Sequence, residues 1–240
     1  MTMKRSGTLI LVAMAWSLSA HAAQLGPYFG ASFGVTEKHD SGAAYDDFIL
    51  GNVYPERAFS PATHDVSLDT KDQGYVGLAG YRIHRHFALE GMFTHFGSVH
   101  YRAISDGTVG LFGETGLIED FPLTVETRAK SSLSGIAMTA LGILPIGRRW
   151  ELYARGGFQF STIRSEIFAV RLAGTERVPR FEAGIARKSR IDAMVGAGVA
   201  MSMFEIYGLR LEYRRVVNAG GDLISRGDAD LLSLGVIIAF

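Results

Sequence analysis

Segments of about ten residues, in which large apolar residues alternate with small or polar ones, recur along this chain, and the gaps between them are alternately long and short. A period of two places successive side chains on opposite faces of a β-strand. In residues 150–163, for example, the large apolar residues fall on one face, while Glu151 and Arg155 fall on the other. The pattern predicts an all-β chain built from antiparallel strands.

The segments and gaps define a topology. Strands are predicted at residues 27–35, 74–82, 87–96, 133–144, 150–163, 190–202, 209–214 and 230–240. Long connections are predicted at 36–73, 97–130, 164–188 and 218–229, and short ones at 83–86, 145–149 and 204–208. A short connection implies an antiparallel hairpin. Eight such strands predict an up-and-down transmembrane β-barrel that carries both chain ends on its short-turn side.

A ten-stranded barrel remains an alternative, because residues 109–112 and 123–125 could form a further hairpin. We interpret them instead as extensions of the neighbouring strands into a long loop. The residues between them include Glu114, Glu119 and Asp120, which would fit badly in hydrocarbon.

The charged residues within the strand-like segments indicate where lipid lies. They occupy the face opposite the large apolar residues and are Glu90, Glu151, Arg155, Arg210 and Glu212. An ionised side chain that faces lipid at the bilayer midplane costs about 2–4 kcal/mol, so these residues should point into the lumen and form an ionic network there. Alternation alone also fits a soluble β-sandwich with one wet face. Alternating loop lengths and strands without proline favour the barrel.

The amino-terminal residues predict export. Lys4 and Arg5 precede an apolar run at residues 9–18, and Ala20-His21-Ala22 forms a small-x-small cleavage signal. These features predict a signal peptide at residues 1–22 and a single barrel domain at residues 23–240. The formal net charge of zero gives no electrostatic reason to expect nucleic acid as a partner.

Four pieces of the sequence carry a family resemblance. They are Gly-Tyr-Val-Gly-Leu-Ala-Gly-Tyr-Arg at 74–82, Phe-Ala-Leu-Glu-Gly-Met-Phe-Thr-His-Phe-Gly at 87–97, Leu-Arg-Leu-Glu-Tyr-Arg at 209–214, and the closing strand that ends on Phe240. Residues 23–240 resemble the small outer-membrane β-barrels of the outer-membrane protein A type. The resemblance implies a location in the cell outer membrane, surrounded by its lipid and lipopolysaccharide, and a lumen network that plugs or gates the barrel.

The closing strand has an expected role in biogenesis. Its residues Leu234, Val236, Ile238 and Phe240 resemble the signal that the barrel-assembly machinery recognises. Full-length relatives of this type add a peptidoglycan-binding domain after the barrel, whereas this sequence ends at Phe240, so we do not expect tethering to the cell wall. Interfacial aromatic residues are expected near the short turns. The candidates are Trp150, Tyr207, Tyr213 and Phe240.

The expected function is non-enzymatic: envelope integrity, or surface interaction with an extracellular ligand through the loops at 36–73 and 97–130. The alternatives are a narrow channel for ions or small solutes and, third, a lipid-modifying enzyme. For the enzyme, Ser98 lies near His95 and His100, without an evident triad. His84 and His86 lack a third metal ligand. We therefore predict no catalytic residue, no metal and no cofactor. A cluster of aspartates makes the first long loop acidic; it comprises Asp40, Asp46, Asp47, Asp65, Asp69 and Asp72.

Overall fold

The computed structural model describes residues 25–39, 59–113, 116–173, 176–177, 181–204, 206–221 and 225–239. The strands are β1 (Gly26–Lys38), β2 (Phe59–Asp69), β3 (Lys71–His84), β4 (Phe87–Gly113), β5 (Gly116–Ile146), β6 (Trp150–Ala173), β7 (Glu176–Arg177), β8 (Phe181–Ser202), β9 (Tyr207–Gly221) and β10 (Ser225–Ala239). The described residues contain no helix of the length and apolarity that a membrane crossing requires. The predicted signal peptide, Phe240, Asp40, Asp46 and Asp47 lie outside the described residues.

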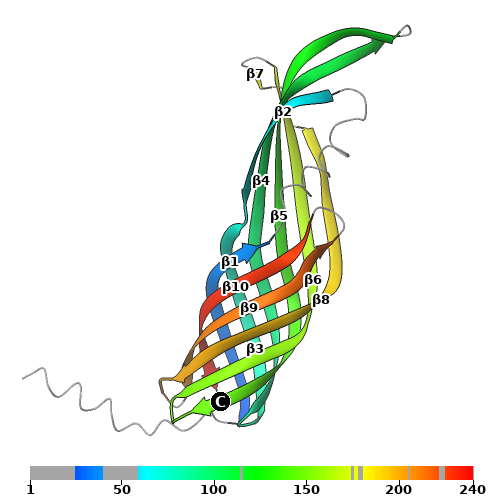
Figure 1. Ribbon diagram of the computed structural model, residues 1–240. Helices are drawn as coiled ribbons and strands as arrows, with labels where there is room; N and C mark the ends of the chain where they lie inside the picture. The colour runs from blue at the N-terminus through cyan, green and yellow to red at the C-terminus, as the bar shows by residue number, and fades with distance from the viewer. Residues whose placement is uncertain are drawn as a thin grey trace, which may run out of the picture.

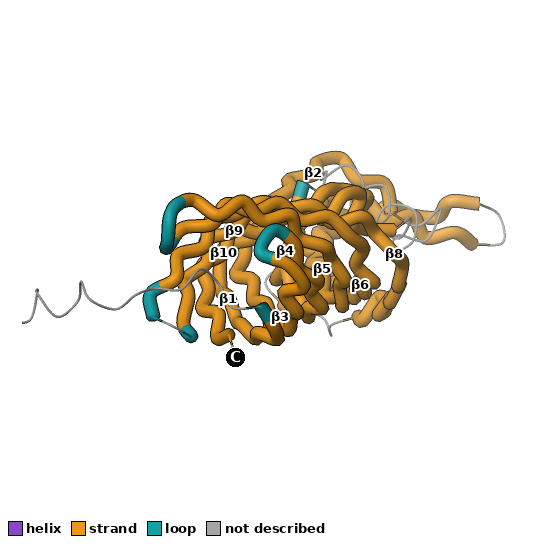
Figure 2. Tube along the Cα trace, turned by 90° about the horizontal axis from the view of Figure 1, so that it is seen from below, coloured by secondary structure: helices purple, strands orange, loops and turns teal. Residues whose placement is uncertain are grey.

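The strands form one closed antiparallel barrel (Figures 1 and 2). Around the ring the order is β3, β1, β10, β9, β8, β6, β5 and β4, and β4 pairs with β3 to close it. The first and last strands of the ring pair from Tyr28 with Ala239 to Lys38 with Ala229. Of the ten strands in the sheet, β2 and β7 pair only with β4 and β6 and stand outside the ring. The predicted eight-stranded barrel is confirmed.

The strands on one side of the barrel continue far beyond the membrane. A tilted strand needs about 9–11 residues to cross a bilayer, yet β4 has 27 residues and β5 has 31. Their pairing continues, with two irregularities, from Phe87 opposite Gly142 to Gly113 opposite Gly116. Residues 109–112 and 123–125 are therefore strand extensions, as we preferred, and the ring contains no further hairpin.

Most of the predicted long loops are also ordered β-structure. Residues 97–130 form the hairpin extension of β4 and β5, and residues 59–69 form β2, which lies against β4. Figure 1 shows these strands rising from the barrel above the ends of β1, β9 and β10. We call this extension the distal sheet: β2 with residues 99–113 of β4, 116–131 of β5 and 164–173 of β6. The prediction of a long loop at residues 97–130 was therefore wrong, apart from the strand extensions expected within it.

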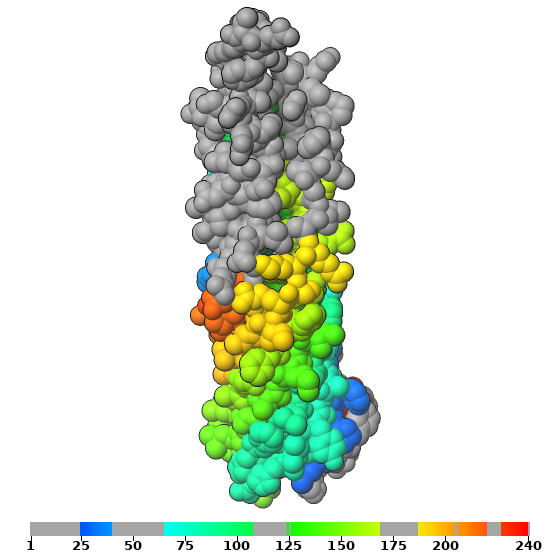
Figure 3. Space-filling view, turned by 90° about the vertical axis from the view of Figure 1, so that its right-hand side faces the viewer, coloured from blue at the N-terminus to red at the C-terminus, as the bar shows by residue number. Residues whose placement is uncertain are grey.

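Apolar side chains cover the outside of the barrel. They form a continuous band around it and include Phe29, Phe33, Leu89, Phe93, Ile136, Met138, Leu152, Phe158, Phe160, Ile191, Leu211, Leu234 and Val236. Because polar residues fill the alternate, inward positions, burial is the reverse of that in a soluble protein. Figure 3 shows the wall of side chains on the face where β8 is drawn in yellow.

The aromatic residues at the edges of this band match the predictions only in part. Trp150 and Tyr207 begin their strands at the short-turn end and are exposed. Tyr213 lies at the other edge, where its side chain hydrogen-bonds to Asp230. The guanidinium carbon of Arg215 lies over the Tyr213 ring, 6.0 Å from the ring centroid. The prediction that Tyr213 belongs to the short-turn girdle was wrong, because β9 begins at Tyr207 and Tyr213 lies too far along it.

A bulge in β4 joins the barrel to the distal sheet. The register of β4 against β5 shifts between His95 and Ser98, and Gly97 has a positive φ of 66°. Below the bulge Thr94 faces the lumen, whereas above it the inward positions become odd-numbered, as at Val99. The Asp72 carboxylate accepts a hydrogen bond of 2.7 Å from the Ser98 N–H. The bulge therefore resets which residues face inward.

We expect Gly97→Ala to destabilise the barrel by about 1–3 kcal/mol, because alanine is strained at positive φ. An added Cβ would also lie 2.6 Å from the Cβ of Asp72. Urea unfolding in lipid vesicles measures the loss. Gly91→Ala, in the same strand, is the matched control, because a Cβ there meets nothing within 4 Å. Equal stability of the two variants would contradict the importance of the bulge.

Candidate functional site

Four of the predicted lumen residues meet in one buried ionic network. Arg155 on β6 places Nη2 2.8 Å from Oε2 of Glu90 and 2.8 Å from Oε2 of Glu212. Arg210 on β9 places Nη1 2.7 Å from Oε1 of Glu90. The side chains of Arg155 and Glu90 are fully buried, and that of Glu212 is 1 % exposed. Each carboxylate is therefore shared between the two guanidinium groups.

This network spans the lumen. Glu90 is on β4 and Arg210 is on β9, and these strands lie four places apart in either direction around the ring. Strands at opposite positions of a closed barrel face one another across its axis. The ion pair of Glu90 and Arg210 therefore closes the lumen, and Arg155 on β6 reinforces it. Such a layer can work as a plug, or as a gate if its pairs rearrange.

Three further residues complete the network and were not among the predicted ones. Tyr28 donates a hydrogen bond of 2.6 Å to Glu90, and Tyr153 donates one of 2.6 Å to Glu212. Arg214 pairs with Glu212. The signal was present in the sequence, because Tyr153 and Arg214 lie two residues from Arg155 and Glu212 and so share their face.

Glu151 is in a separate pair. Its carboxylate accepts hydrogen bonds from Arg82 Nη1 at 3.0 Å and from Arg82 Nη2 at 2.9 Å, near the short-turn end of the barrel. In the described residues no ion pair connects this carboxylate to Arg155 or Arg210. The two-residue period places Glu151 on the inward face but does not give its depth in the lumen, so it does not identify Arg82 as its partner.

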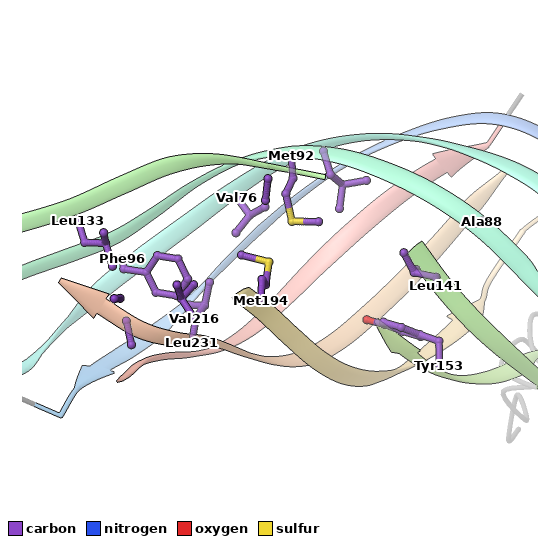
Figure 4. Close-up of a cluster of buried hydrophobic side chains, with 14 of the residues drawn as sticks. Val76, Ala88, Met92, Phe96, Leu133, Leu141, Tyr153, Met194, Val216 and Leu231 are labelled. Atoms are coloured by element: carbon purple, nitrogen blue, oxygen red, sulfur yellow. The ribbon is translucent and has the colours of Figure 1, made fainter. Parts of the chain in front are cut away.

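An apolar layer lies on the far side of the network from the short turns. Phe96, Leu133, Met194, Val216 and Leu231 are each at most 2 % exposed and come from five different strands. Figure 4 shows these side chains converging within the ring, with Phe96 beside Val216. Close packing of this kind leaves no water-filled path. An ionic layer and an apolar layer thus close the lumen in series.

Below the network the lumen opens into a cavity of about 80 Å³ at the short-turn end. Tyr28, Tyr153 and Arg210 form its inner wall, and the pair of Arg82 and Glu151 also lines it. The remaining lining is mainly apolar. The cavity therefore ends at the ionic layer and does not continue through the barrel.

The histidines and serine considered for catalysis do not form a triad. Ser98 is buried, and the described residues show no hydrogen bond from its hydroxyl to His95 or His100. His95 stacks on Tyr75 with ring centroids 4.8 Å apart. Burial by itself would raise the pKa of Asp72, but the N–H groups of Gln73 and Ser98 lower it overall. This carboxylate thus acts on the backbone of the bulge.

The other candidates are placed as follows. His84 and His86 lie 5.5 Å apart between ring centroids, and the described part of the chain holds no cluster of three or more metal-ligating side chains. Asp65 and Asp69 lie on β2 and are exposed. In the closing strand, Leu234 and Val236 face outward toward lipid, and Ile238 is half-buried.

Basic residues collect on the outside of the barrel, just above the apolar band. We call this set the basic rim; it comprises His100, Arg102, Arg128, Lys130, Arg164 and Arg187, all exposed. The strand register places Arg102 opposite Arg128 and Arg164 opposite Arg187. Like charges directly opposite one another destabilise a sheet.

Two carboxylates offset part of this charge. Glu126 lies 2.6 Å from Arg102 and 2.8 Å from Arg128, and Glu166 lies 2.9 Å from Arg164. Burial would raise the pKa of Glu126, but hydrogen bonds from the two arginines lower it. Five lysine and arginine side chains against two carboxylates leave the basic rim a net electropositive surface.

Comparison with known proteins identifies the family. The model of the outer membrane protein beta-barrel domain matches residues 8–240. Similar solved structures include Neisserial surface protein A (15% identity, 90% of this chain and 97% of that chain, TM-score 0.48). A second is the Pseudomonas aeruginosa outer membrane protein OprG (10% identity, 93% of this chain and 100% of that chain, TM-score 0.46). A third is Ail of Yersinia pestis, solved with a heparin analogue (10% identity, 90% of this chain and 100% of that chain, TM-score 0.43).

No curated protein sequence matches the chain significantly. The family model covers nearly the whole sequence, and the closed antiparallel barrel with an apolar exterior is the architecture that it describes. The chain belongs to the outer membrane protein β-barrel family and is a protein of the Gram-negative outer membrane.

Proposed function

We propose that this protein is a non-enzymatic anchor that holds a rigid β-sheet outside the cell for surface interaction. The observation that carries the proposal is the long pairing of β4 with β5. From Ser131 to Gly116 the strand continues for about 50 Å at 3.3 Å per residue. A regular hydrogen-bonded sheet has a fixed shape, unlike a flexible loop, and can present one surface to a partner.

The closed lumen favours this role over a channel. Conduction would require both the layer of Glu90, Arg155, Arg210 and Glu212 and the apolar layer around Phe96 to open. A buried ion pair costs heavily when one partner moves away from the other. A static plug is also what an anchor requires, because it preserves the permeability barrier of the membrane.

The test replaces residues 104–126 with an Asn-Gly turn between Ala103 and Thr127, which lie opposite one another in β4 and β5. We expect the variant barrel to insert and to migrate as a folded species on unboiled gels. Bacteria that express it should lose most of their binding to matrix-coated plates, whereas the unaltered protein should confer binding. Undiminished binding by the variant would contradict the proposal.

Planar-bilayer recording distinguishes the channel alternative. The unaltered protein should show no discrete openings, because both lumen layers are closed. Discrete openings that change in Arg155→Gln would favour the narrow channel.

The basic rim supports a second part of the proposal, a contribution to envelope integrity through contact with lipopolysaccharide. Arg164 lies only four residues beyond Phe160, the last apolar residue of β6 in the band, and so near the level of lipid headgroups. Arginine binds phosphate oxygens through paired N–H groups. Anionic phosphates on the sugar headgroups would relieve the repulsion between Arg102 and Arg128.

We expect Arg128→Gln, Lys130→Gln and Arg164→Gln together to weaken the binding of lipopolysaccharide to the purified protein by at least about tenfold, since each exposed charge contact contributes up to about 1 kcal/mol. Binding should also weaken as salt is raised. The matched control is Arg148→Gln with Arg149→Gln, in the exposed turn at the opposite end of the barrel. Equal binding by both variants, or equal affinity for dephosphorylated lipopolysaccharide, would overturn this part.

A further inference from the structure

A small cavity lies inside the barrel wall, beside the ionic network and separate from the larger cavity at the short-turn end. It is formed by β1, β3, β9 and β10 and has a volume of about 10 Å³. Its polar lining consists of Ser32, Ser233, Arg210, Glu212 and Arg214. A cavity of this volume can hold one small ion or one water molecule.

The polar atoms that lack partners here are hydrogen-bond donors. Within the described residues, Ser32 Oγ, Ser233 Oγ, Arg210 Nε, and Nη1 and Nη2 of Arg214 have no hydrogen-bond partner. Arg214 is fully buried, so water outside the protein does not reach these atoms. Buried donors of this kind are normally satisfied, and leaving one unpaired is destabilising.

The charged groups beside the cavity also favour an anion, because positive charges outnumber negative ones. The network joins the three arginines Arg155, Arg210 and Arg214 to only two carboxylates, Glu90 and Glu212. The neighbouring Arg82 is already paired with Glu151. Within this network of described residues the arginines exceed the carboxylates by one, and an uncompensated buried charge is strongly destabilising.

We propose that this cavity binds a single small monovalent anion of halide size. The fork of Arg214 and the hydroxyls of Ser32 and Ser233 supply convergent donors, and the bound charge would neutralise the network. Glu212 does not oppose this, because Arg214, Arg155 and Tyr153 already engage its carboxylate oxygens. A water molecule would satisfy some donors but would leave the excess charge.

The test uses the full refolded protein with bromide as the probe. Crystals grown in sodium bromide should show an anomalous peak between Arg214 and Ser233, and the peak should be absent from crystals grown in sodium gluconate. In solution, the unfolding midpoint should rise with bromide concentration at constant ionic strength and should rise less with gluconate. The absence of both the peak and the bromide-specific rise would overturn the proposal, and would leave water as the occupant.

Two variants locate the site. Ser32→Ala with Ser233→Ala removes both hydroxyls and leaves every ion pair in place, and it should weaken bromide binding by at least about tenfold. Ser161→Ala is the control, because Ser161 is also buried in the lumen but accepts a hydrogen bond from Gln159. Equal bromide affinity in the double variant and the control would assign the ion to another place and contradict the proposal. If the double variant does not fold, the bromide experiments on the unaltered protein still decide.

Discussion

Arg155→Gln is expected to destabilise the folded barrel by about 3–5 kcal/mol, the largest effect of any single substitution considered. Arg155 contacts both Glu90 and Glu212 at 2.8 Å, and all three side chains are buried. The substitution breaks both of these buried ion pairs at once, and each carboxylate loses a charged donor in a region without bulk water. Glutamine retains hydrogen-bonding groups and approximate size, so the loss reports chiefly on charge. Urea unfolding in lipid vesicles, followed by the fluorescence of Trp150, measures it.

Two comparisons make this result interpretable. Arg164 lies on the same strand, but its side chain is 57% exposed and pairs with Glu166 at the surface. Arg164→Gln should therefore lower the free energy of unfolding by less than about 1 kcal/mol. Adding Glu90→Gln to Arg155→Gln should lower stability further, because Glu90 still pairs with Arg210 at 2.7 Å. If Arg155→Gln costs no more than Arg164→Gln, the lumen network does not stabilise the closed state.

Phe158→Arg is expected to cost about 2–4 kcal/mol, because its side chain faces lipid near the middle of β6. An arginine there must carry its charge into hydrocarbon or distort the bilayer around it. Phe158 is 67% exposed in the isolated chain, so in a soluble protein the same substitution would be almost neutral. The free energy of unfolding in vesicles of defined thickness gives the cost.

Thr162→Arg is the depth control for this substitution. Thr162 also faces outward on β6 but lies four residues nearer the outer edge of the apolar band, two residues from Arg164. Near the interface the cost of arginine falls to about 0–1 kcal/mol. An equal loss at both positions would show that the bilayer does not set the cost, and would place the boundary of the band elsewhere.

The barrel could be predicted from the sequence because lipid imposes a strict rule on each strand. An outward charge is costly, so Glu90, Arg155, Arg210 and Glu212 had to face inward, and the structure places them there. Period and turn length then fixed the antiparallel order. What the rule does not supply is depth: Glu151 follows it equally well and yet pairs with Arg82 in a separate layer.

Outside the bilayer the rule no longer applies, and prediction failed there. The distal sheet buries one face, as at Val99, Tyr101 and Ala103, but its outward residues are charged and not apolar, so residues 97–130 resembled a polar loop. The strand β2 was not predicted because it contains Pro61, and proline normally argues against a strand. An edge strand such as β2 tolerates proline. The bulge at Gly97 also changes the inward positions of β4 from even-numbered to odd-numbered residues. A prediction that assumes one continuous period of two along the strand cannot detect such a change.

The pairing of β1 with β10 has a consequence for how this chain reaches its folded state. Most neighbours around the ring are joined by a hairpin, whose short span costs little entropy to close, whereas Phe33 and Leu234 meet only after the whole intervening chain has been arranged. This seam is therefore expected to be the last to form. Until it does, β1 and β10 present open edges that invite pairing with other chains, so dilution or chaperoning before closure should govern the yield of folded protein.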